Sequence, residues 1–319
     1  MIIANPQRPC VAVAGGSGFV GQSLARQLTA AGYAVRVLTR RPTLIAGLAV
    51  LPDVSMHRID DTAQSESWAA AIAGCVAFVN LVGVLHATPK VSFEDAHVTL
   101  VRTQLQACRA AGVPRFVQVS ALGAADAAPS RYLRSKAAAE TLVRESGLAW
   151  TILQPSVIFG QDDAFLNLFA QLERLLPVMV LACPDARFQP VHVEDVAQAI
   201  QRSLALPEAE GQTVQLVGPE PFTLRALIDL VGEWTGKRRP VLGLGPGLSM
   251  LQATLMEWLP VPLMTRDNVR SMQVPNVGSV PPPAWLEWQP ASLRVVVPAY
   301  LQPASGRARY GRMRQHAGR

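Results

Sequence analysis

The chain has 319 residues, of which 50% are hydrophobic and 16% are charged, and its mean hydropathy is +0.21. This composition excludes an intrinsically disordered chain, and the length suits one large α/β domain with a smaller one appended. The net charge is +6, but the tail contributes Arg307, Arg309, Arg312, Arg314 and Arg319 without an acid. The remaining charge of about +1 argues against a nucleic-acid-binding face.

No export signal or membrane span is expected. The first ten residues, MIIANPQRPC, contain two prolines and no apolar core of a signal peptide. The uncharged run 241–256 is shorter than the roughly 20 residues of a spanning helix, and it contains Pro246. We therefore expect a cytoplasmic protein, and peripheral attachment to the cytoplasmic face of the inner membrane stays open.

The cysteines are too scattered to predict a metal site. They are Cys10, Cys75, Cys108 and Cys183, without a C-x-x-C pair among them. In a cytosolic compartment such cysteines stay reduced, and most are expected to be small buried hydrophobic residues.

Strand and helix patterns alternate through the N-terminal half. Short, Val-rich apolar runs predict strands at 10–14, 34–39, 54–59, 76–82, 115–122 and 149–160. Helices are predicted at 19–31, 65–74, 93–112 and 130–147. This alternation predicts an α/β fold built on a doubly wound parallel sheet.

The domain organisation follows from where that pattern ends. Residues 1–160 are predicted to form the nucleotide-binding domain, and segments within 185–217 are expected to return to it. Residues 161–300 form mainly a smaller C-terminal lobe for a substrate, and 301–319 are a basic tail that is expected to be disordered.

A glycine-rich turn follows the first strand. Its pattern is G-x-x-G-x-x-G, and the residues predicted to line a bound dinucleotide are Gly15, Ser17, Gly18, Phe19, Val20 and Gly21. The first glycine allows a tight turn, the second lets the backbone approach a pyrophosphate, and the third permits close helix packing. Backbone amides at the helix start then face the phosphates. The alternative is a tight turn with a purely structural role.

The end of the second strand indicates which dinucleotide binds. An acidic residue there would hold both ribose hydroxyls, but this chain has Thr39 followed by Arg40 and Arg41. Because guanidinium groups match a phosphate, NADP(H) is favoured over NAD(H). The alternative is that one arginine, Arg41, is simply solvated. After the third strand, Asp60 or Asp61 is a candidate for the adenine amino group.

Tyr132 and Lys136 are four residues apart on the predicted helix 130–147, so they share one face. A lysine ammonium near the phenol would lower the tyrosine pKa and prepare it for proton transfer to or from a carbonyl. The strand before this helix ends at Ser120, a candidate hydrogen-bond donor. The alternative is a surface Tyr–Lys pair.

These motifs together resemble the extended and atypical branch of the short-chain dehydrogenase/reductase superfamily. The matching stretches are GGSGFVG, VRVLTRR, AGVPRFVQVSALGA, YLRSKAAAE, LQPSVIFG and RFQPVHVEDVAQAI. Segments 154–177, 251–276 and 292–301 look similar to bacterial relatives of the nucleotide-binding accessory subunit of respiratory complex I. The resemblance covers nearly the whole chain short of the tail.

The resemblance implies a Rossmann-type fold with bound NADPH. It places Arg40 at the 2′-phosphate, and it makes Tyr132 and Lys136 the catalytic tyrosine and lysine. Lys136 would also hold the nicotinamide ribose. The other positions beside the cofactor are Asn80 and Gly83, in the turn after the fourth strand, and Pro155 and Ser156, on the nicotinamide side.

The chain also departs from the superfamily. After Ser120 come Ala121, Leu122 and Gly123, so a second hydroxyl is missing. His97 stands where many extended members carry asparagine, and a helix–strand hydrogen bond is expected of it. The missing hydroxyl favours an NADP(H)-binding protein with a structural or regulatory role in respiratory or quinone metabolism. The alternative is an NADPH-dependent reductase that uses Tyr132 and Lys136 on a carbonyl or quinone-type substrate.

The segment 248–258 bears on whether the chain contacts a membrane or another protein. Leu248, Leu251, Leu255 and Trp258 recur near helical spacing, downstream of the basic GKRR. Such a face can lie in a membrane interface or contact a respiratory complex, and it can equally pack against the chain itself. Beyond NADP(H), the expected partners are an unidentified small-molecule substrate and this membrane or protein surface, and no nucleic acid.

Overall fold

A computed structural model describes residues 8–40, 48, 50–88, 91–259 and 262–302. Its centre is a seven-stranded sheet in the order β3-β2-β1-β4-β5-β6-β11, and every neighbouring pair is parallel. The strands are β1 (Cys10–Ala14), β2 (Ala34–Thr39), β3 (Val54–Arg58), β4 (Ala77–Asn80), β5 (Arg115–Val119), β6 (Ala149–Pro155) and β11 (Gln212–Leu216). The predicted doubly wound parallel sheet is therefore confirmed.

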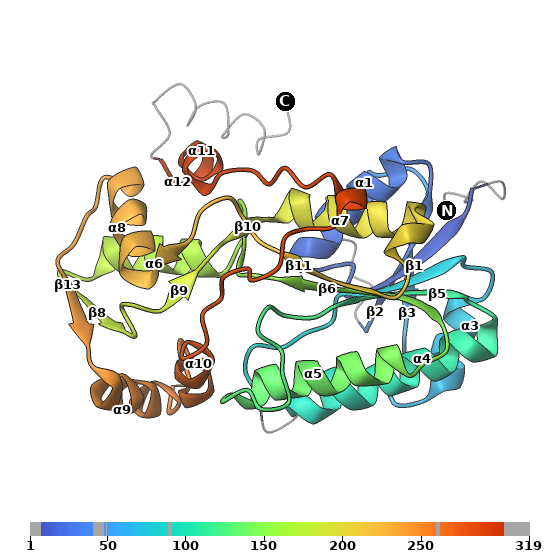
Figure 1. Cartoon of the computed structure of the whole chain (residues 1–319), viewed down its shortest axis with the longest axis horizontal. Coiled ribbons are helices and arrows are strands. Elements are labelled where there is room, and N and C mark those ends of the chain that lie inside the picture. Colours follow the sequence, from blue (N-terminus) through green and yellow to red (C-terminus); the bar gives the residue numbers. More distant parts are fainter. Residues whose placement is uncertain (1–7, 41–47, 49, 89–90, 260–261, 303–319) are drawn as a thin grey trace.

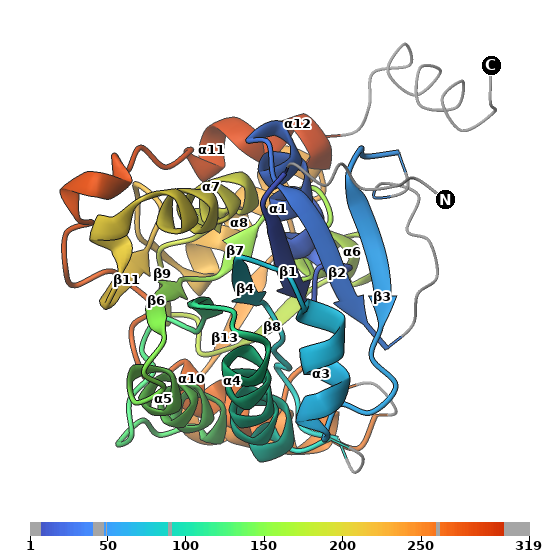
Figure 2. The ribbon, with the colours of Figure 1, turned by 90° about the vertical axis from the view of Figure 1, so that its right-hand side faces the viewer.

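Helices cover both faces of this sheet (Figure 1). One face is covered by α1 (Phe19–Ala30) and α7 (Val193–Ala205), and the other by α3 (Ser65–Ile72), α4 (Leu100–Ala111) and α5 (Arg131–Arg144). The turned view in Figure 2 shows the same three layers. Two hydrophobic clusters fill the space between sheet and helices, because successive residues of a strand point to opposite faces. Val11 and Val13 face α1 and α7, whereas Ala12 and Ala14 face the other layer.

The strand order reverses direction between β1 and β4. This is the topological switch point of a doubly wound sheet, where ligands bind beyond the carboxyl ends of the strands. The glycine turn after β1, Asn80 at the end of β4 and Ser120 after β5 all lie at this edge.

The C-terminal part of the chain adds a smaller lobe beside the carboxyl edge (Figure 1). Its elements include α6 (Phe165–Leu175), α8 (Leu224–Thr235), α9 (Pro246–Met256), α10 (Arg266–Ser271), α11 (Leu293–Val296) and α12 (Pro298–Leu301). Three short strand pairs join it: β7 (Ile158–Phe159) with β10 (Val191–His192), β9 (Arg187–Phe188) with β12 (Phe222–Thr223), and β8 (Met179–Ala182) with β13 (Val241–Leu244). A third hydrophobic cluster, which includes Phe188, Leu227 and Val297, forms its core.

Two predicted elements are divided in the structure. The helix predicted at 93–112 begins with a π-helical turn, Glu94–Thr99, before α4 starts at Leu100. The strand predicted at 149–160 breaks after Pro155 and resumes as β7. π-helical turns are rare and often accompany functional sites, and this one carries His97.

Arg41 and the basic tail after residue 302 lie outside the described residues. Among the helices of the described part, none is long and apolar enough to cross a membrane.

Candidate functional site

The glycine turn joins β1 to α1 in a conformation that requires glycine. Gly15 has φ +77°, in the left-handed region, and its carbonyl accepts a hydrogen bond from the Gly18 amide at 3.0 Å. A Cβ atom at Gly21 would lie 2.4 Å from the backbone of Gly16, so only hydrogen fits where α1 meets the turn. The sequence pattern is thus explained at its first and third glycines by backbone shape and by close packing.

The start of α1 is suited to an anion. Its N-cap is Gly18, and among the described residues no side chain caps the helix. The first backbone amides of a helix have no partner within it and carry the positive end of the dipole. Ser17 is half-buried, Gly18 is exposed, and the partly buried Phe19 and Val20 begin the helix. This turn therefore fits the pyrophosphate of a dinucleotide.

The end of β2 presents a cation to the solvent. Thr39 is the last residue of the strand, and Arg40 follows it with an exposed side chain. Asp60, after β3, is also exposed and pairs with Arg58 at 2.6 Å. Asp61 accepts hydrogen bonds from the Ala63 amide and from Gln64. The Asp60 carboxylate therefore has a local partner in this structure, and its predicted contact with adenine stays a prediction.

Asn80 and Gly83 shape the turn after β4. The fully buried Asn80 side chain donates to Gln118 at 3.0 Å and accepts from the Val82 amide at 3.1 Å. A Cβ at Gly83 would lie 3.1 Å from the Lys136 ammonium, so glycine leaves room for that group. The turn and the helix α5 thus meet at Lys136.

Lys136 is 4% exposed, and its ammonium donates to the Val119 carbonyl at 3.4 Å. Burial lowers the pKa of Lys136 to about 8, while the carboxylate of Glu140, one turn along α5, opposes this shift. Glu140 is itself buried and is bonded to Arg144 and Gln154. The lysine therefore remains mostly protonated at neutral pH, at the edge where the cofactor is predicted to bind.

Tyr132 packs in an aromatic cluster at the start of α5. Its ring lies 5.6 Å from that of His97 and 6.0 Å from that of Phe93, both edge to face. Burial raises the pKa of Tyr132 to about 12, which is opposite to the lowering that the sequence predicted. That prediction is wrong for this structure, since burial sets the shift and the Lys136 ammonium lies against the Val119 carbonyl. The phenol is thus protonated at neutral pH and able to donate.

His97 links the turn after β4 to α5. Its Nε2 accepts from the Val84 amide at 3.1 Å, which places the ring proton on Nδ1, 2.8 Å from the Ser135 hydroxyl. Ser135 in turn donates to the carbonyl of Tyr132 at 2.8 Å. Burial and the nearby Lys136 charge lower the pKa of His97 to about 3, so the ring stays neutral. The expected structural hydrogen bond is made, although it reaches a loop and not a strand.

Ser120 lies at the carboxyl end of β5. Its amide donates to Leu153 at 2.7 Å, and the residue is 5% exposed. Among the described residues its hydroxyl has no hydrogen-bond partner. Buried hydroxyls are seldom left without partners, and such a group is a candidate for contact with a ligand.

Pro155 is the last residue of β6, and Ser156 follows it at the same edge. The Ser156 hydroxyl donates to the Asn276 side chain at 2.5 Å, and the Val157 amide donates to the same oxygen at 3.0 Å. Asn276 also donates to the Leu122 carbonyl at 3.3 Å. Ser156 thus fastens the C-terminal lobe to the sheet, a link that the sequence analysis missed because the two residues are 120 positions apart.

A second residue of the lobe reaches the helix that carries the Tyr–Lys pair. The Asp267 carboxylate accepts from the backbone amides of Arg131 and Tyr132, at 2.8 and 3.0 Å. Ser130 caps the same helix end by accepting from the Leu133 amide. Thr265 and Asn268 form a capping box at the start of α10, whereas the contact of Asp267 with α5 depends on tertiary structure.

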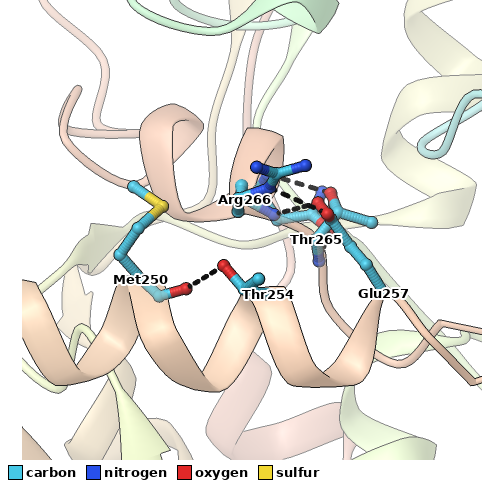
Figure 3. Close-up of polar contacts among 6 residues, drawn as sticks. Met250, Thr254, Glu257, Thr265 and Arg266 are labelled. Atoms are coloured by element: carbon cyan, nitrogen blue, oxygen red, sulfur yellow. Dashed lines mark hydrogen bonds and ion pairs between the residues drawn. The ribbon is translucent and has the colours of Figure 1, made fainter.

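Asp267 belongs to α10, which is fixed to α9 by an ion pair. Figure 3 shows Glu257, just past α9, accepting from both the backbone and the guanidinium of Arg266, at 2.7 and 2.8 Å. Within α9 the Thr254 hydroxyl bonds back to the Met250 carbonyl at 2.8 Å. α9, α10 and the amino end of α5 therefore form one connected unit.

Comparison with known proteins identifies the family of the chain. Residues 15–176, half of the chain, match the family described as NAD(P)H-binding. The chain belongs to this NAD(P)H-binding family. The match begins at the first glycine of the turn and includes Ser120, Tyr132 and Lys136. The predicted membership of the short-chain dehydrogenase/reductase superfamily, in its atypical and extended branch, is confirmed.

The relatives of this chain include a subunit of a mitochondrial NADH dehydrogenase and a reductase. The chain is 35% identical over 235 residues to "NADH dehydrogenase [ubiquinone] 1 alpha subcomplex subunit 9, mitochondrial" of Arabidopsis thaliana, covering 70% of this chain and 58% of that protein. It is 32% identical over 202 residues to "Ceramide reductase" of Caulobacter vibrioides, covering 61% of each. The chain thus spans about three fifths of the length of these relatives.

A solved structure shares the fold of this NAD(P)H-binding chain. A nucleoside-diphosphate-sugar epimerase from Staphylococcus aureus superposes with a TM-score of 0.70 at 16% identity, covering 92% of this chain and 99% of that one. At this identity the likeness shows the fold alone. It confirms that the lobe and the sheet together follow a known arrangement.

Proposed function

We propose that this NAD(P)H-binding protein is an NADP(H)-dependent reductase of a carbonyl or quinone-type substrate. The observation that carries the proposal is the buried Ser120 hydroxyl, which has no partner among the described residues. It lies next in sequence to Val119, whose carbonyl Lys136 contacts. In the sequence analysis, the missing second hydroxyl favoured a structural role for the protein. The Ser120 hydroxyl nevertheless offers one hydrogen-bond donor at the switch point that has no partner among the described residues.

The residues have complementary roles in this proposal. When bound, the reduced nicotinamide supplies a hydride. Tyr132, protonated because its pKa is about 12, donates the proton to the substrate oxygen, and Ser120 donates a hydrogen bond to the same oxygen. The Lys136 ammonium would hold the ribose of the bound cofactor and would stabilise the phenolate that remains after proton donation. Tyr132 is then reprotonated from solvent.

The preference for NADP(H) over NAD(H) is part of the same proposal. Arg40 is exposed directly after β2, where an acidic residue would bind the ribose of NAD(H). An exposed guanidinium at this position suits the 2′-phosphate.

The nucleotide and its exchange rate test the proposal. Mass spectrometry would identify the nucleotide that copurifies with the folded chain, and labelled NADPH would report its exchange. A consumed cosubstrate must leave at least as fast as turnover, about 1 to 1,000 per second for common enzymes. We expect NADPH to exchange within seconds and to be oxidised by a carbonyl or quinone. NADPH retained for hours would exclude the reductase.

A second candidate function is supported by α9. In this second function, the protein binds NADP(H) without turning it over. The bound nucleotide stabilises the protein as a subunit of a respiratory or quinone-linked assembly on the cytoplasmic face of the inner membrane. Four exposed side chains favour such a surface: Leu248 at 57%, Leu251 at 54%, Leu255 at 60% and Trp258 at 84%. The Arabidopsis thaliana relative is named as a subunit of a mitochondrial NADH dehydrogenase.

A further inference from the structure

Two cysteines meet at the edge of the sheet opposite the nucleotide site. Cys10 is the first residue of β1, and Cys75 lies two residues before β4 begins. Their sulfur atoms are 3.2 Å apart, although the residues are 65 positions apart in the chain. The backbone holds this contact in place, because the Val76 amide donates to the Cys10 carbonyl at 2.8 Å. A disulfide needs a separation of about 2 Å, so a small movement would join the sulfurs.

Arg36 of β2 lies beside the pair. It is adjacent to Ala12 across the parallel ladder, and its guanidinium donates to the carbonyls of Ala71 and Ala73 at 2.8 and 2.9 Å. These carbonyls lie in the segment that leads into Cys75. The buried Nε of Arg36 has no hydrogen-bond partner among the described residues. Arg36 therefore both fixes the Cys75 segment and places positive charge near the sulfurs.

The two thiols differ in acidity and access. A hydrogen bond from Cys75 and the charge of Arg36 outweigh burial and lower the pKa of Cys10 to about 7. The same hydrogen bond, together with burial, raises the pKa of Cys75. Cys10 is partly exposed, whereas Cys75 is 5% exposed. Cys10 thus has the properties of an attacking thiolate, and Cys75 those of a resolving thiol.

We propose that Cys10 and Cys75 form a modification site for low-molecular-mass disulfides of the glutathione type. The Cys10 thiolate attacks one sulfur of the oxidant, forms a mixed disulfide and releases one glutathione thiolate. Cys75 then loses its proton and attacks the Cys10 sulfur, and the second glutathione leaves as a thiolate. Two protein thiols are oxidised to one disulfide while one glutathione disulfide is reduced to two thiols.

The position of the pair gives the modification a defined consequence. The resulting loop from 10 to 75 encloses the glycine turn, α1 and Arg40. A crosslink that closes a long loop restricts the unfolded chain and so stabilises the folded state. Because the sulfurs lie at the amino ends of β1 and β4, the nucleotide edge itself is left unaltered. The inference is independent of the proposed reductase activity.

Mass spectrometry of the full chain tests the site. The reduced protein is incubated with glutathione disulfide at pH 7.5, its remaining thiols are alkylated, and the digest is searched for a crosslinked pair of peptides. We expect a loss of two hydrogens, one peptide pair joined through Cys10 and Cys75, and a raised Tm that a reductant reverses. Cys75→Ser should stop at a glutathione adduct on Cys10.

Matched variants decide whether the pair itself reacts. Cys108→Ser, at a buried cysteine outside the pair, should behave like the parent chain. Cys10→Ser should leave Cys75 unmodified in the folded protein. The proposal fails if the parent chain keeps both thiols free under these conditions, if it stops at the mixed disulfide, or if Cys10→Ser is modified at Cys75 as fast as the parent.

Discussion

Lys136 shows how single residues set the chemistry of the carboxyl edge. Complete burial would favour a neutral amine, but Glu140 lies one turn away on α5 and opposes that shift. The pKa of about 8 leaves the ammonium charged at neutral pH, next to Gly83 and the Val119 carbonyl. His97 is neutral over the same range because its pKa is about 3. Of these two neighbouring residues, Lys136 is therefore the one that carries a charge at neutral pH.

At the scale of one hydroxyl, Tyr132→Phe tests the proton donor. The variant keeps the aromatic packing with Phe93 and His97 and removes the phenolic proton. Since positioned acids contribute about 10²- to 10⁴-fold, we expect NADPH oxidation with an active substrate to fall by about that factor. Steady-state rates would be measured together with the Kd for NADPH, which should stay within about twofold.

Tyr33→Phe, at a half-buried tyrosine of the sheet domain, is the control for that substitution. A parent-like rate in Tyr132→Phe would remove Tyr132 from the mechanism and favour the candidate in which the nucleotide is only bound.

Arg40→Ala tests the nucleotide preference. Loss of one guanidinium–phosphate pair should weaken NADPH binding by about 10- to 100-fold and leave NADH binding nearly unchanged. Both Kd values can be measured by calorimetry. Arg102→Ala, at an exposed arginine of α4, controls for loss of charge. Equal weakening of NADPH binding and NADH binding would show that Arg40 does not bind the 2′-phosphate.

At the scale of elements, the amino end of α5 depends on a different part of the chain. Helix ends leave backbone amides without partners, and here the lobe supplies Asp267 for two of them. A carboxylate at this end also interacts favourably with the helix dipole. The orientation of Tyr132 is therefore coupled to α10 and, through Glu257 and Arg266, to α9.

Asp267→Ala should loosen that coupling. We expect a loss of about 0.5 to 2 kcal/mol in the free energy of unfolding and faster hydrogen exchange at the amides of Arg131 and Tyr132. If the protein is a reductase, kcat should fall more than KM changes. Asp162→Ala, at an exposed aspartate, is the matched control. Unchanged exchange at these two amides would contradict the role given to Asp267.

The packing of α6 against α8 contains a buried carboxyl group. Glu173 is fully buried, neither of its carboxyl oxygens has a hydrogen-bond partner among the described residues, and burial together with Asp229 raises its pKa to about 7. Because the folded pKa lies above the unfolded value, the folded chain binds this proton more tightly. The stability from this group is complete below about pH 4.5 and is lost as the pH rises through 7.

Glu173→Gln should therefore stabilise the protein at pH 8 by about 1 to 3 kcal/mol and have little effect at pH 5. Urea unfolding at the two pH values would measure this difference. Glu66→Gln, at an exposed glutamate of α3, is expected to change neither value. Stabilisation of equal size at both pH values would mean that Glu173 does not titrate in this range.

At the scale of the whole molecule, the lobe carries an exposed apolar surface that the sheet domain does not cover. Leu248, Leu251, Leu255 and Trp258, here named the α9 face, lie in α9 or just after it, and each is more than half exposed. The basic run 237–239 precedes this segment in the chain. An apolar helix face with basic flanks suits an anionic lipid surface.

The second candidate function predicts flotation of the intact chain with anionic vesicles at low salt. Replacing Leu251 and Leu255 together by Gln should reduce the bound fraction at least about tenfold, since each removes most of a buried leucine from the interface. Val295→Gln, at an exposed valine of α11, is the control. No association of the parent chain with these vesicles would remove the membrane surface from the proposal.

The sequence predicted the sheet domain well because its signals are local. A strand, a glycine turn and a helix follow one another within 10–31, and their side chains pack mainly by alternation and helical period. The same holds for Tyr132 and Lys136, whose spacing fixes them to one helix. The interrupted elements were missed, since a π-helical turn at 94–99 has the same apolar pattern as an α-helix.

Sequence alone determined the doubly wound sheet, the nucleotide turn and the residue types at the candidate site, because each depends on neighbours within about twenty positions. Tertiary structure decided how deeply those residues are buried and how their pKa values shift. Burial, which no local pattern reports, raised the pKa of Tyr132 and lowered that of Lys136. It was also the fold that brought Asp267 to α5, Asn276 to Ser156 and Cys75 to Cys10, since hydrogen bonds and sulfur contacts between distant segments exist only once the sheet has assembled.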